Sequence, residues 1–297
     1  MKMKKVQVLM STYNGQTYLK KQIESILEQT YPNIELLVRD DGSSDHTIDI
    51  LRDYEERYEN IKVIYGKNIG VNGSFFYLLA QSNSDYLAFS DQDDIWLPEK
   101  IQNAVEKLDY YTVPALYAGN KILIDQNDSI IKENNKKEKK PSFSNALIEN
   151  ICTGCTIVMN KKLADNLKIH IPKQAILHDW WCYLVASYLG IVVYDEQAYI
   201  LYRQHGNNII GQNRNIIKKI EFNIKYILKN RGKLSKQLKE FQKNYHIIPE
   251  KDRQLQKLIK AEKFPGTFQM VFNKNIRRQS MADDIIMRLL FICKLML

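Results

Sequence analysis

Three polar runs in this 297-residue chain have the residue types and spacing to do chemistry. They are Ser11-Thr12-Tyr13-Asn14-Gly15, Asp40-Asp41-Gly42-Ser43-Ser44-Asp45 and Asp91-Gln92-Asp93-Asp94. Each run directly follows a short apolar, β-branched stretch that predicts a strand. Ligands of an open parallel sheet bind beyond the carboxyl ends of its strands, so the three runs should meet on one face.

The third run is a candidate cation site. Three carboxylates within four residues repel one another, and a fold keeps such a cluster chiefly when a cation compensates the charge. Asp91 and Asp93, two apart in an extended loop, should point the same way and offer oxygens to Mg²⁺ or Mn²⁺. Such a metal would stabilise a diphosphate leaving group. The alternative is a helix-capping acidic turn before Pro98.

The second run suits a nucleotide. A carboxylate at the end of a strand can accept the imide N–H of a pyrimidine base, and Gly42 lets the backbone come close to a ligand. The alternative is that Asp45 only caps the next helix. If helix capping were the only role of these side chains, it would have to apply to each of the three polar runs independently.

Hydrophobic periodicity predicts the elements that position these runs. Short strands alternate with helices across 2–6 residue loops, which indicates an α/β fold with a parallel sheet and crossover helices. The predicted strands are Val6–Met10, Ile34–Arg39, Lys62–Tyr65, Tyr86–Ser90, Ala115–Ile124, Asn150–Asn160, Ile191–Tyr194 and Tyr199–Tyr202, and the predicted helices are Thr17–Gln29, Asp45–Tyr58, Ser74–Gln81, Glu99–Tyr110 and His178–Tyr188.

Charge divides the chain in two. Residues 1–214 hold 24 Lys and Arg against 27 Asp and Glu, whereas residues 215–297 hold 19 against 7. We predict a catalytic domain over 1–214 and a basic, mostly helical extension over 215–297, with one helix at Ile216–Lys229. The +12 charge of the extension favours an anionic partner, a membrane surface before a nucleic acid.

The last apolar segment, Ile285–Leu297, has two interpretations. At about 13 residues it is too short to cross a bilayer, which needs ~20. It either lies in a membrane interface or packs on the domain.

Cysteine usage indicates a reducing, cytoplasmic compartment. The chain has four cysteines and no apolar signal segment at its start. Cys152 and Cys155 form a CxxC pair, but no second pair or suitably spaced histidines lie nearby. We therefore expect both to be small buried residues.

Four motifs together resemble those of the family-2 inverting glycosyltransferases of the GT-A fold. Ser-Thr-Tyr-Asn, Asp-Asp-Gly-Ser-Ser-Asp, the Asn68-Ile69-Gly70 turn and Ser-Asp-Gln-Asp-Asp-Ile-Trp occur in the family's order and approximate spacing, within about residues 4–206. The resemblance implies that the Asp-x-Asp element binds Mn²⁺ or Mg²⁺ through Asp91 and Asp93, with Asp93 as the more direct ligand. It implies that a nucleotide-sugar donor contacts Thr12, Tyr13, Asn14, Asp40, Asp41, Asn68, Gly70, Asp91, Gln92 and Arg203.

The same resemblance points to a catalytic base. The family's acidic pair falls on His178-Asp179, with the Glu replaced by His178. Asp179 would then take the proton of the acceptor hydroxyl as that oxygen attacks the anomeric carbon opposite the diphosphate, which inverts configuration. His178, Trp180 and Trp181 would bind the acceptor, the tryptophans as an apolar platform for a sugar face. The alternatives are a helix cap for Asp179 and core packing for the tryptophans.

A fifth segment, Tyr202-Arg203-Gln204-His205-Gly206-Asn207-Asn208, lacks the Gln-x-x-Arg-Trp element of processive polysaccharide synthases. This favours the transfer of a single sugar. Arg203 and His205 are expected at the diphosphate, and His205 either completes the metal shell as a neutral imidazole or is structural.

These motifs together look most like bacterial rhamnosyltransferases of cell-surface polysaccharide assembly. The resemblance implies a dTDP-β-L-rhamnose donor and a lipid-linked glycan acceptor. It implies a cytoplasmic protein, peripheral at the inner face of the cell membrane, with homodimerisation through the C-terminal helices as a further expectation. Residue chemistry alone does not separate thymidine from uridine, so a UDP-hexose donor is the alternative.

Two other classes of function are disfavoured. A nucleic-acid-binding protein with an inactive domain would explain the basic extension but leave the acidic cluster without purpose, so we expect no nucleic-acid partner. A nucleotidyltransferase or phosphatase is weakened by the absence of a Gly-rich phosphate loop with Lys.

Overall fold

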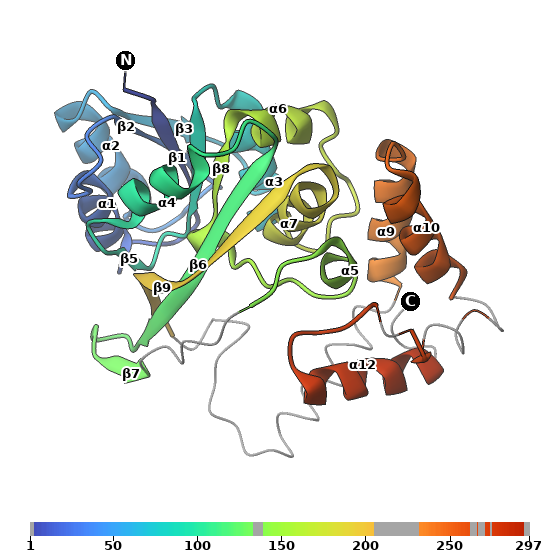
Figure 1. Ribbon diagram of the computed structural model, residues 1–297. Helices are drawn as coiled ribbons and strands as arrows, with labels where there is room; N and C mark the ends of the chain where they lie inside the picture. Colours follow the sequence, from blue (N-terminus) through green and yellow to red (C-terminus); the bar gives the residue numbers. More distant parts are fainter. Residues whose placement is uncertain are drawn as a thin grey trace. The chain divides into compact units, whose positions relative to one another are not determined.

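The computed structural model describes residues 3–132, 139–204, 232–261, 266, 271–273 and 275–293, which form two compact units (Figure 1). In the described ranges, the first unit contains residues 3–132, 152–171 and 189–204. The second contains residues 139–151, 172–188 and the described residues after 231. Four predicted features lie outside the described residues: the boundary between 214 and 215, the helix Ile216–Lys229, His205 and residues 294–297 of the last segment. The division at 214 stays a prediction.

A mixed sheet forms the first unit. Its order is β3-β2-β1-β4-β8-β6-β9-β5, with β7 paired to β6. The pairs β1–β2, β2–β3, β1–β4 and β6–β9 are parallel, and the others are antiparallel. The predicted α/β class with a mostly parallel sheet is confirmed. The strands are β1 (Val6–Thr12), β2 (Ile34–Asp40), β3 (Ile61–Tyr65), β4 (Tyr86–Ser90), β5 (Ile95–Trp96), β6 (Ala115–Ile124), β7 (Ile130–Lys132), β8 (Val158–Asn160) and β9 (Ile191–Arg203).

Amphipathic helices cover this sheet (Figure 1). In α1, Leu19, Ile23 and Ile26 recur at helical spacing, and all three are buried in one apolar cluster together with side chains of β1 and β2. In α6, which sequence periodicity did not predict, the Asn160 side chain caps the first turn by accepting from the Leu163 amide at 3.1 Å. The helices of the first unit are α1 (Leu19–Leu27), α2 (Thr47–Arg57), α3 (Gly70–Gln81), α4 (Lys100–Leu108) and α6 (Lys161–Ile169), with a 3₁₀ turn at Gly154–Thr156.

Two strand predictions were wrong in extent. The predicted strands Ile191–Tyr194 and Tyr199–Tyr202 are one strand, β9, because β6 pairs with it along its length through register shifts near Asn120. Of the predicted strand Asn150–Asn160, only Val158–Asn160 is extended. The Thr156 amide and hydroxyl both donate to the Thr153 carbonyl, at 2.9 and 2.7 Å, and this closes the 3₁₀ turn that replaces the rest.

The second unit is helical and is built around an aromatic cluster. Phe241 of α9 lies at the centre, with ring centroids 5.7 Å from Trp181, 5.4 Å from Tyr188 and 4.8 Å from Tyr245. The Tyr188 hydroxyl donates to Asp252 at 2.6 Å. The predicted C-terminal helices are therefore present. The helices of this unit are α5 (Phe143–Ala146), α7 (His178–Leu189), α9 (Lys233–Asn244), α10 (Pro249–Lys260) and α12 (Met281–Ile292).

Candidate active site

Strand register brings the three polar runs to one edge of the first unit's sheet. Thr12 pairs with Asp40 across β1 and β2, and Asp40 pairs with Tyr65 across β2 and β3. On the other side of β1, Met10 pairs with Ser90. The loops after β1, β2, β3 and β4 therefore leave the sheet side by side, as the sequence predicted.

Hydrogen bonds join the first two loops around Asp40. This carboxylate is 1% exposed, and it accepts from the Ser43 amide at 3.0 Å and from the Thr12 hydroxyl at 3.3 Å. Ser43 in turn accepts from the Asn14 amide at 2.9 Å. Gly42 has φ of 83° and lies against Gly66, so the turn after Asp40 requires glycine. Direct contact of Thr12, Asn14 and Asp40 with a nucleotide stays a prediction.

Asp41 has a structural role that the sequence did not predict. Its two carboxylate oxygens accept from the amides of Ile69 and Gly70, both at 2.8 Å, and it forms a buried ion pair with Arg39. These bonds start α3 at Gly70, four residues before the predicted helix. Asp41 therefore positions the Asn68–Gly70 turn, and its contact with a nucleotide stays a prediction. The Asn68 side chain itself is exposed, and its role stays a prediction.

The loop after β4 is tied to the loop after β1. Gln92 accepts from the Tyr13 amide at 2.8 Å and donates to the Tyr13 carbonyl at 3.2 Å. A Cβ atom at Gly15 would clash with the Gln92 amide oxygen, so a side chain there would displace this contact. The Tyr13 ring is 48% exposed and is open to a ligand on this edge.

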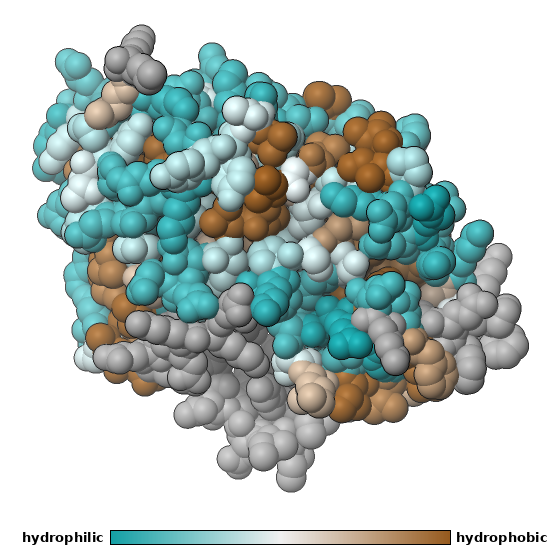
Figure 2. Space-filling model, in the orientation of Figure 1, coloured by the Kyte–Doolittle hydropathy of each residue, from teal (hydrophilic) through white to brown (hydrophobic). Residues whose placement is uncertain are grey.

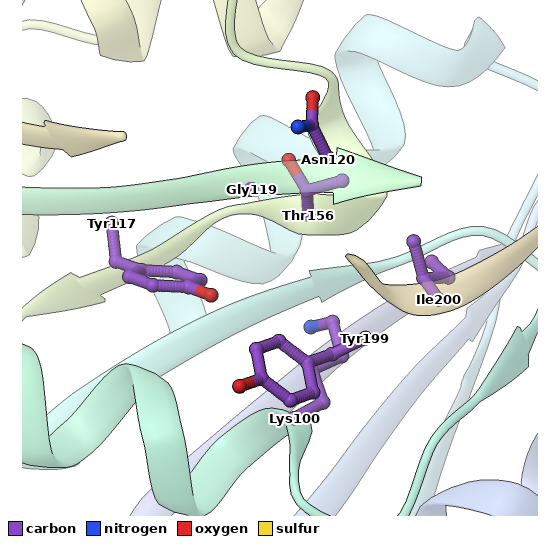
Figure 3. Close-up of a pocket in the computed structure, with 7 residues that line it drawn as sticks. All are labelled: Lys100, Tyr117, Gly119, Asn120, Thr156, Tyr199 and Ile200. Atoms are coloured by element: carbon purple, nitrogen blue, oxygen red, sulfur yellow. The ribbon is translucent and has the colours of Figure 1, made fainter. Parts of the chain in front are cut away.

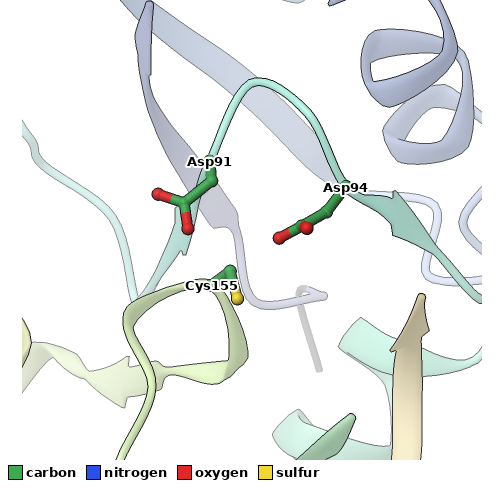
Figure 4. A group of neighbouring side chains, drawn as sticks. All are labelled: Asp91, Asp94 and Cys155. Atoms are coloured by element: carbon green, nitrogen blue, oxygen red, sulfur yellow. The ribbon is translucent and has the colours of Figure 1, made fainter. Parts of the chain in front are cut away.

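The acidic loop gathers a different set of groups from the predicted pair. It bends at Gln92 and Asp93 instead of running extended, so alternate side chains do not point the same way. Among the described residues, the carboxylates of Asp91 and Asp94 and the Cys155 thiol lie within 4.8 Å of one another (Figure 4). Asp93 does not join this group. Asp94 and Cys155 were not predicted as ligands, and for Cys155 no local sequence signal exists, because β8 and the turn before it are brought there by antiparallel pairing with β4.

The chemistry of this group fits a divalent cation. Asp94 is 1% exposed, and its Oδ2 has no hydrogen-bond donor at bonding geometry within the described ranges. Burial, followed by the negative charge of Asp93, raises the pKa of Asp94 to about 7. A cation would supply the missing partner and favour the charged carboxylate. Carboxylates suit Mg²⁺ and Mn²⁺, whereas thiolates suit softer metals, and burial raises the pKa of the Cys155 thiol, so the two carboxylates are the better ligands of the group.

Arg203 corrects a sequence-based assignment. Its side chain is fully buried and donates to the backbone carbonyls of Asp93 at 2.7 Å and Asp125 at 3.0 Å. It also forms an ion pair with Asp128 and stacks 4.3 Å from the centroid of the Tyr18 ring. Arg203 therefore holds the acidic loop in place from inside and does not contact a diphosphate in this arrangement.

A small cavity lies between α4, β6 and β9 (Figure 3). The cavity has room for roughly one water molecule, so it is not a substrate pocket. Lys100 lines it, and its buried Nζ has no hydrogen-bond acceptor among the residues that the structure describes. The Nζ lies 3.5 Å from the centroid of the Trp96 ring, and burial lowers the pKa of Lys100 to about 7.

Asp179 lies in the second unit, in the first turn of α7. Its Oδ1 accepts from the Trp180 amide at 2.7 Å, and the side chain is largely buried. Burial lowers the pKa of the neighbouring His178 to about 3, so this histidine is neutral. The roles of Asp179 as base and of His178 as acceptor ligand stay predictions.

Trp181 was wrongly expected to form a sugar platform. It is fully buried and packs against Phe241 and Tyr245, so no face of its ring is open. Trp180 is half-buried and donates from its indole nitrogen to the Ala146 carbonyl at 2.7 Å. Of the two tryptophans, only Trp180 can contact an acceptor in this structure, and this role stays a prediction.

Comparisons with known proteins agree with this architecture. Residues 7–168 match the sequence profile described as "Glycosyl transferase family 2". The chain is 33% identical to the dTDP-rhamnosyl transferase RfbG of Shigella flexneri over 73% of this chain and 76% of that one. It is 31% identical to the UDP-Glc:alpha-D-GlcNAc-diphosphoundecaprenol beta-1,3-glucosyltransferase WfgD of Escherichia coli over 53% and 61%.

A solved structure supports the fold. The mannosyltransferase PcManGT of Pyrobaculum calidifontis, in complex with GDP-Man and Mn²⁺, superposes with a TM-score of 0.58 at 16% identity and covers 89% of this chain and 71% of that one. The predicted GT-A architecture is thus confirmed. The profile match, the identity to RfbG and this shared fold agree, and the chain belongs to glycosyltransferase family 2.

Proposed function

We propose that the protein transfers a single L-rhamnose from dTDP-β-L-rhamnose, with inversion, to a hydroxyl of a lipid-linked glycan during bacterial cell-surface polysaccharide synthesis. The observation that carries the proposal is the convergence of four loops on one sheet edge in a chain 33% identical to a dTDP-rhamnosyl transferase. The diphosphoundecaprenol acceptor in the name of WfgD supports a lipid-linked acceptor.

Donor binding would use the joined loops after β1 and β2. Tyr13 is exposed beside the Asp40–Ser43 turn and supplies an aromatic face to a base. The Asp40 carboxylate keeps the amides of Gly42 and Ser43 turned inward, which fixes the shape of the turn that a ribose would meet.

A divalent cation, Mn²⁺ or Mg²⁺, would be held by Asp91 and Asp94, with Asp93 beside them. When bound, it neutralises the donor diphosphate and makes it a better leaving group. Arg203 and Gln92 keep the acidic loop in its bent form, so that these carboxylates are arranged before the donor arrives.

Asp179 would remove the proton of the attacking hydroxyl. Its Oδ1 accepts from the Trp180 amide at 2.7 Å, which fixes the orientation of the carboxylate in the first turn of α7. Because the neighbouring His178 is neutral, no adjacent positive charge lowers the basicity of this carboxylate from that side. A single displacement of this kind gives an α-L-rhamnoside from the β-linked donor.

A thermal-shift screen of dTDP-L-rhamnose, UDP-glucose, UDP-GlcNAc and GDP-mannose tests the proposal, each with Mn²⁺ and with EDTA. We expect dTDP-L-rhamnose to give the largest shift, and only with metal. Incubation of that donor with a GlcNAc-diphosphate-lipid acceptor, followed by NMR of the product, then reports the anomeric configuration. A larger shift with a UDP-hexose would replace rhamnose by the alternative donor, and no shift with any donor would contradict the whole scheme.

A further inference from the structure

Helix α12 has two apolar faces, and one of them is open. Met287 and Phe291 are 0% and 2% exposed and pack into the second unit. On the opposite side, large apolar residues recur at positions i, i+4, i+5, i+8 and i+11, and they are 45–81% exposed. We call this set the open face of α12: Met281, Ile285, Ile286, Leu289 and Ile292.

The open face belongs to an anchored helix. The Arg288 guanidinium donates to Asp284 at 2.8 Å and to the carbonyls of Asn273 and Ile276 at 3.1 and 3.2 Å. The segment before α12 is bound to α5, since the Asn145 side chain of α5 donates to the Arg277 carbonyl at 3.0 Å. Arg288, the one basic residue within α12, is thus used to hold the helix and does not interrupt the open face.

Contiguous exposed apolar side chains of this size are uncommon on a soluble surface and mark contact sites. Figure 2 shows brown surface at the place where Figure 1 draws α12. Phe272 is a further exposed apolar residue, at 67%, and its chain neighbours Val271 and Asn273 are the ones bound to Arg288. Of the two interpretations of the last segment, packing holds for one face of α12, and contact of the other face with a membrane interface stays a prediction.

Basic residues at helical spacing occupy the outer faces of α9 and α10 in the same unit. Lys233, Lys236, Lys239 and Lys243 are all exposed on α9, and Arg253, Lys257 and Lys260 are exposed on α10. Two of the acids on these helices are engaged within the protein, since Glu240 accepts from the amides of residues 173 and 174 and Asp252 accepts from Tyr188, whereas Glu250 is exposed beside the basic residues of α10. This unit therefore combines an apolar face with two basic stripes.

We propose, resting on the lipid-linked acceptor proposed above, that the open face of α12 inserts into the interface of an anionic lipid bilayer. Apolar side chains enter the acyl boundary while the lysine and arginine stripes attract the headgroups. A second copy of the chain is a poorer occupant, because each extension carries a net charge of +12 and two of them repel. In the described residues no helix has the length and apolarity to cross a bilayer, so the contact is at the surface.

Vesicle co-sedimentation tests this inference with the full chain and no donor or acceptor. Probes are phosphatidylcholine vesicles and vesicles of equal parts phosphatidylcholine and phosphatidylglycerol. We expect binding to the anionic vesicles that weakens with salt. The double variant Ile285→Glu, Leu289→Glu should bind at least ten-fold more weakly. The matched control is Ile169→Glu, an isoleucine of the first unit that is 69% exposed, and it should bind like the native chain.

A second readout does not depend on a variant. Cys293 follows the open face and is exposed, whereas Cys152, Cys155 and Cys182 are buried, so an environment-sensitive dye will label Cys293 selectively. Its emission should shift to the blue on anionic vesicles. Absence of vesicle binding, equal binding by the double variant, or a native dimer that the double variant dissociates would each overturn the proposal. Because the assay contains no sugar donor, its outcome is separate from that of the donor screen.

Discussion

The sheet edge where the loops after β1, β2, β3 and β4 meet, called the donor edge here because we propose that the sugar donor binds there, and the α7 region of the second unit place polar groups in different ways. At the donor edge, loops after neighbouring strands bind one another, as in the contacts of Asp40 with Ser43 and of Gln92 with Tyr13. In the second unit, Asp179 stands at the start of a helix whose opposite end is fixed by aromatic packing to α9. Short loops preorganise the donor edge, whereas distant core packing positions the proposed base.

The largest expected effect concerns the base. Asp179→Asn should lower kcat by about 10²–10⁴-fold and leave donor affinity unchanged, because it removes proton acceptance and keeps the side-chain shape. Steady-state kinetics and donor titration measure the two quantities. Asp165→Asn, an exposed change on α6, is the control. Native turnover by the Asp179→Asn variant would mean that another group takes the proton.

The next effect concerns stability of the donor edge. Asp41→Asn leaves the buried Arg39 without its counter-charge, which should cost about 3 kcal/mol of unfolding free energy. Urea unfolding measures it. The matched change Asp53→Asn removes an exposed ion pair with Arg57 and should cost less than about 0.5 kcal/mol. Similar losses in both variants would show that the Asp41 pair does not organise this edge.

Metal affinity distinguishes the ligand pair predicted from sequence, Asp91 and Asp93, from the group that the structure brings together, Asp91, Asp94 and Cys155. Asp94→Asn should weaken Mn²⁺ binding about ten-fold or more, because it removes a charged oxygen from the group formed with Asp91 and Cys155. Isothermal titration with MnCl₂ gives the affinity. Asp93→Asn is the comparison, since the sequence motif assigns that residue. Loss only in the Asp93→Asn variant would restore the ligand pair expected from sequence.

The smallest expected effect is an increase in the free energy of unfolding. Lys100→Met should stabilise the protein by about 1–2 kcal/mol at pH 7, since it replaces a buried amine that has no acceptor among the described residues. The folded pKa of Lys100 is about 7, below the ordinary 10.5, so the folded state binds fewer protons and native stability should rise as pH increases from 7 to 10.5. The variant should lose this slope in unfolding measurements, whereas Lys62→Met, an exposed change, should keep it.

Sequence reasoning was strongest where function depends on strand register. The position of Asp40 and Asp91 at strand ends followed from apolar runs of a few residues, and parallel pairing then made their loops neighbours. It failed where a side chain faces inward. Arg203 and Asp41 look like ligand-binding groups in the sequence. In the structure Arg203 donates to a backbone carbonyl of the protein, and Asp41 accepts from a backbone amide. The predicted sugar platform at Trp181 was also wrong, because its ring faces inward against Phe241. That partner lies 60 residues further along the chain, beyond the reach of a local pattern.

The cluster with Cys155 lies beyond the reach of local patterns. Its formation depends on the antiparallel pairing of β8 with β4 and on a 3₁₀ turn, and neither has a periodic signature. The sequence did predict that Cys155 is buried. It did not predict that burial brings the thiol to a carboxylate cluster.

The two units are interleaved along the chain: segments 139–151 and 172–188 join the second unit while 152–171 and 189–204 return to the first. A protein shortened after β9 would keep every strand of the sheet and lose α9, and with it Phe241 and Tyr245. Trp181 and Tyr188 would then expose their rings to water. A chain that ended with the last strand of the sheet would therefore expose aromatic rings of α7 and be prone to aggregate.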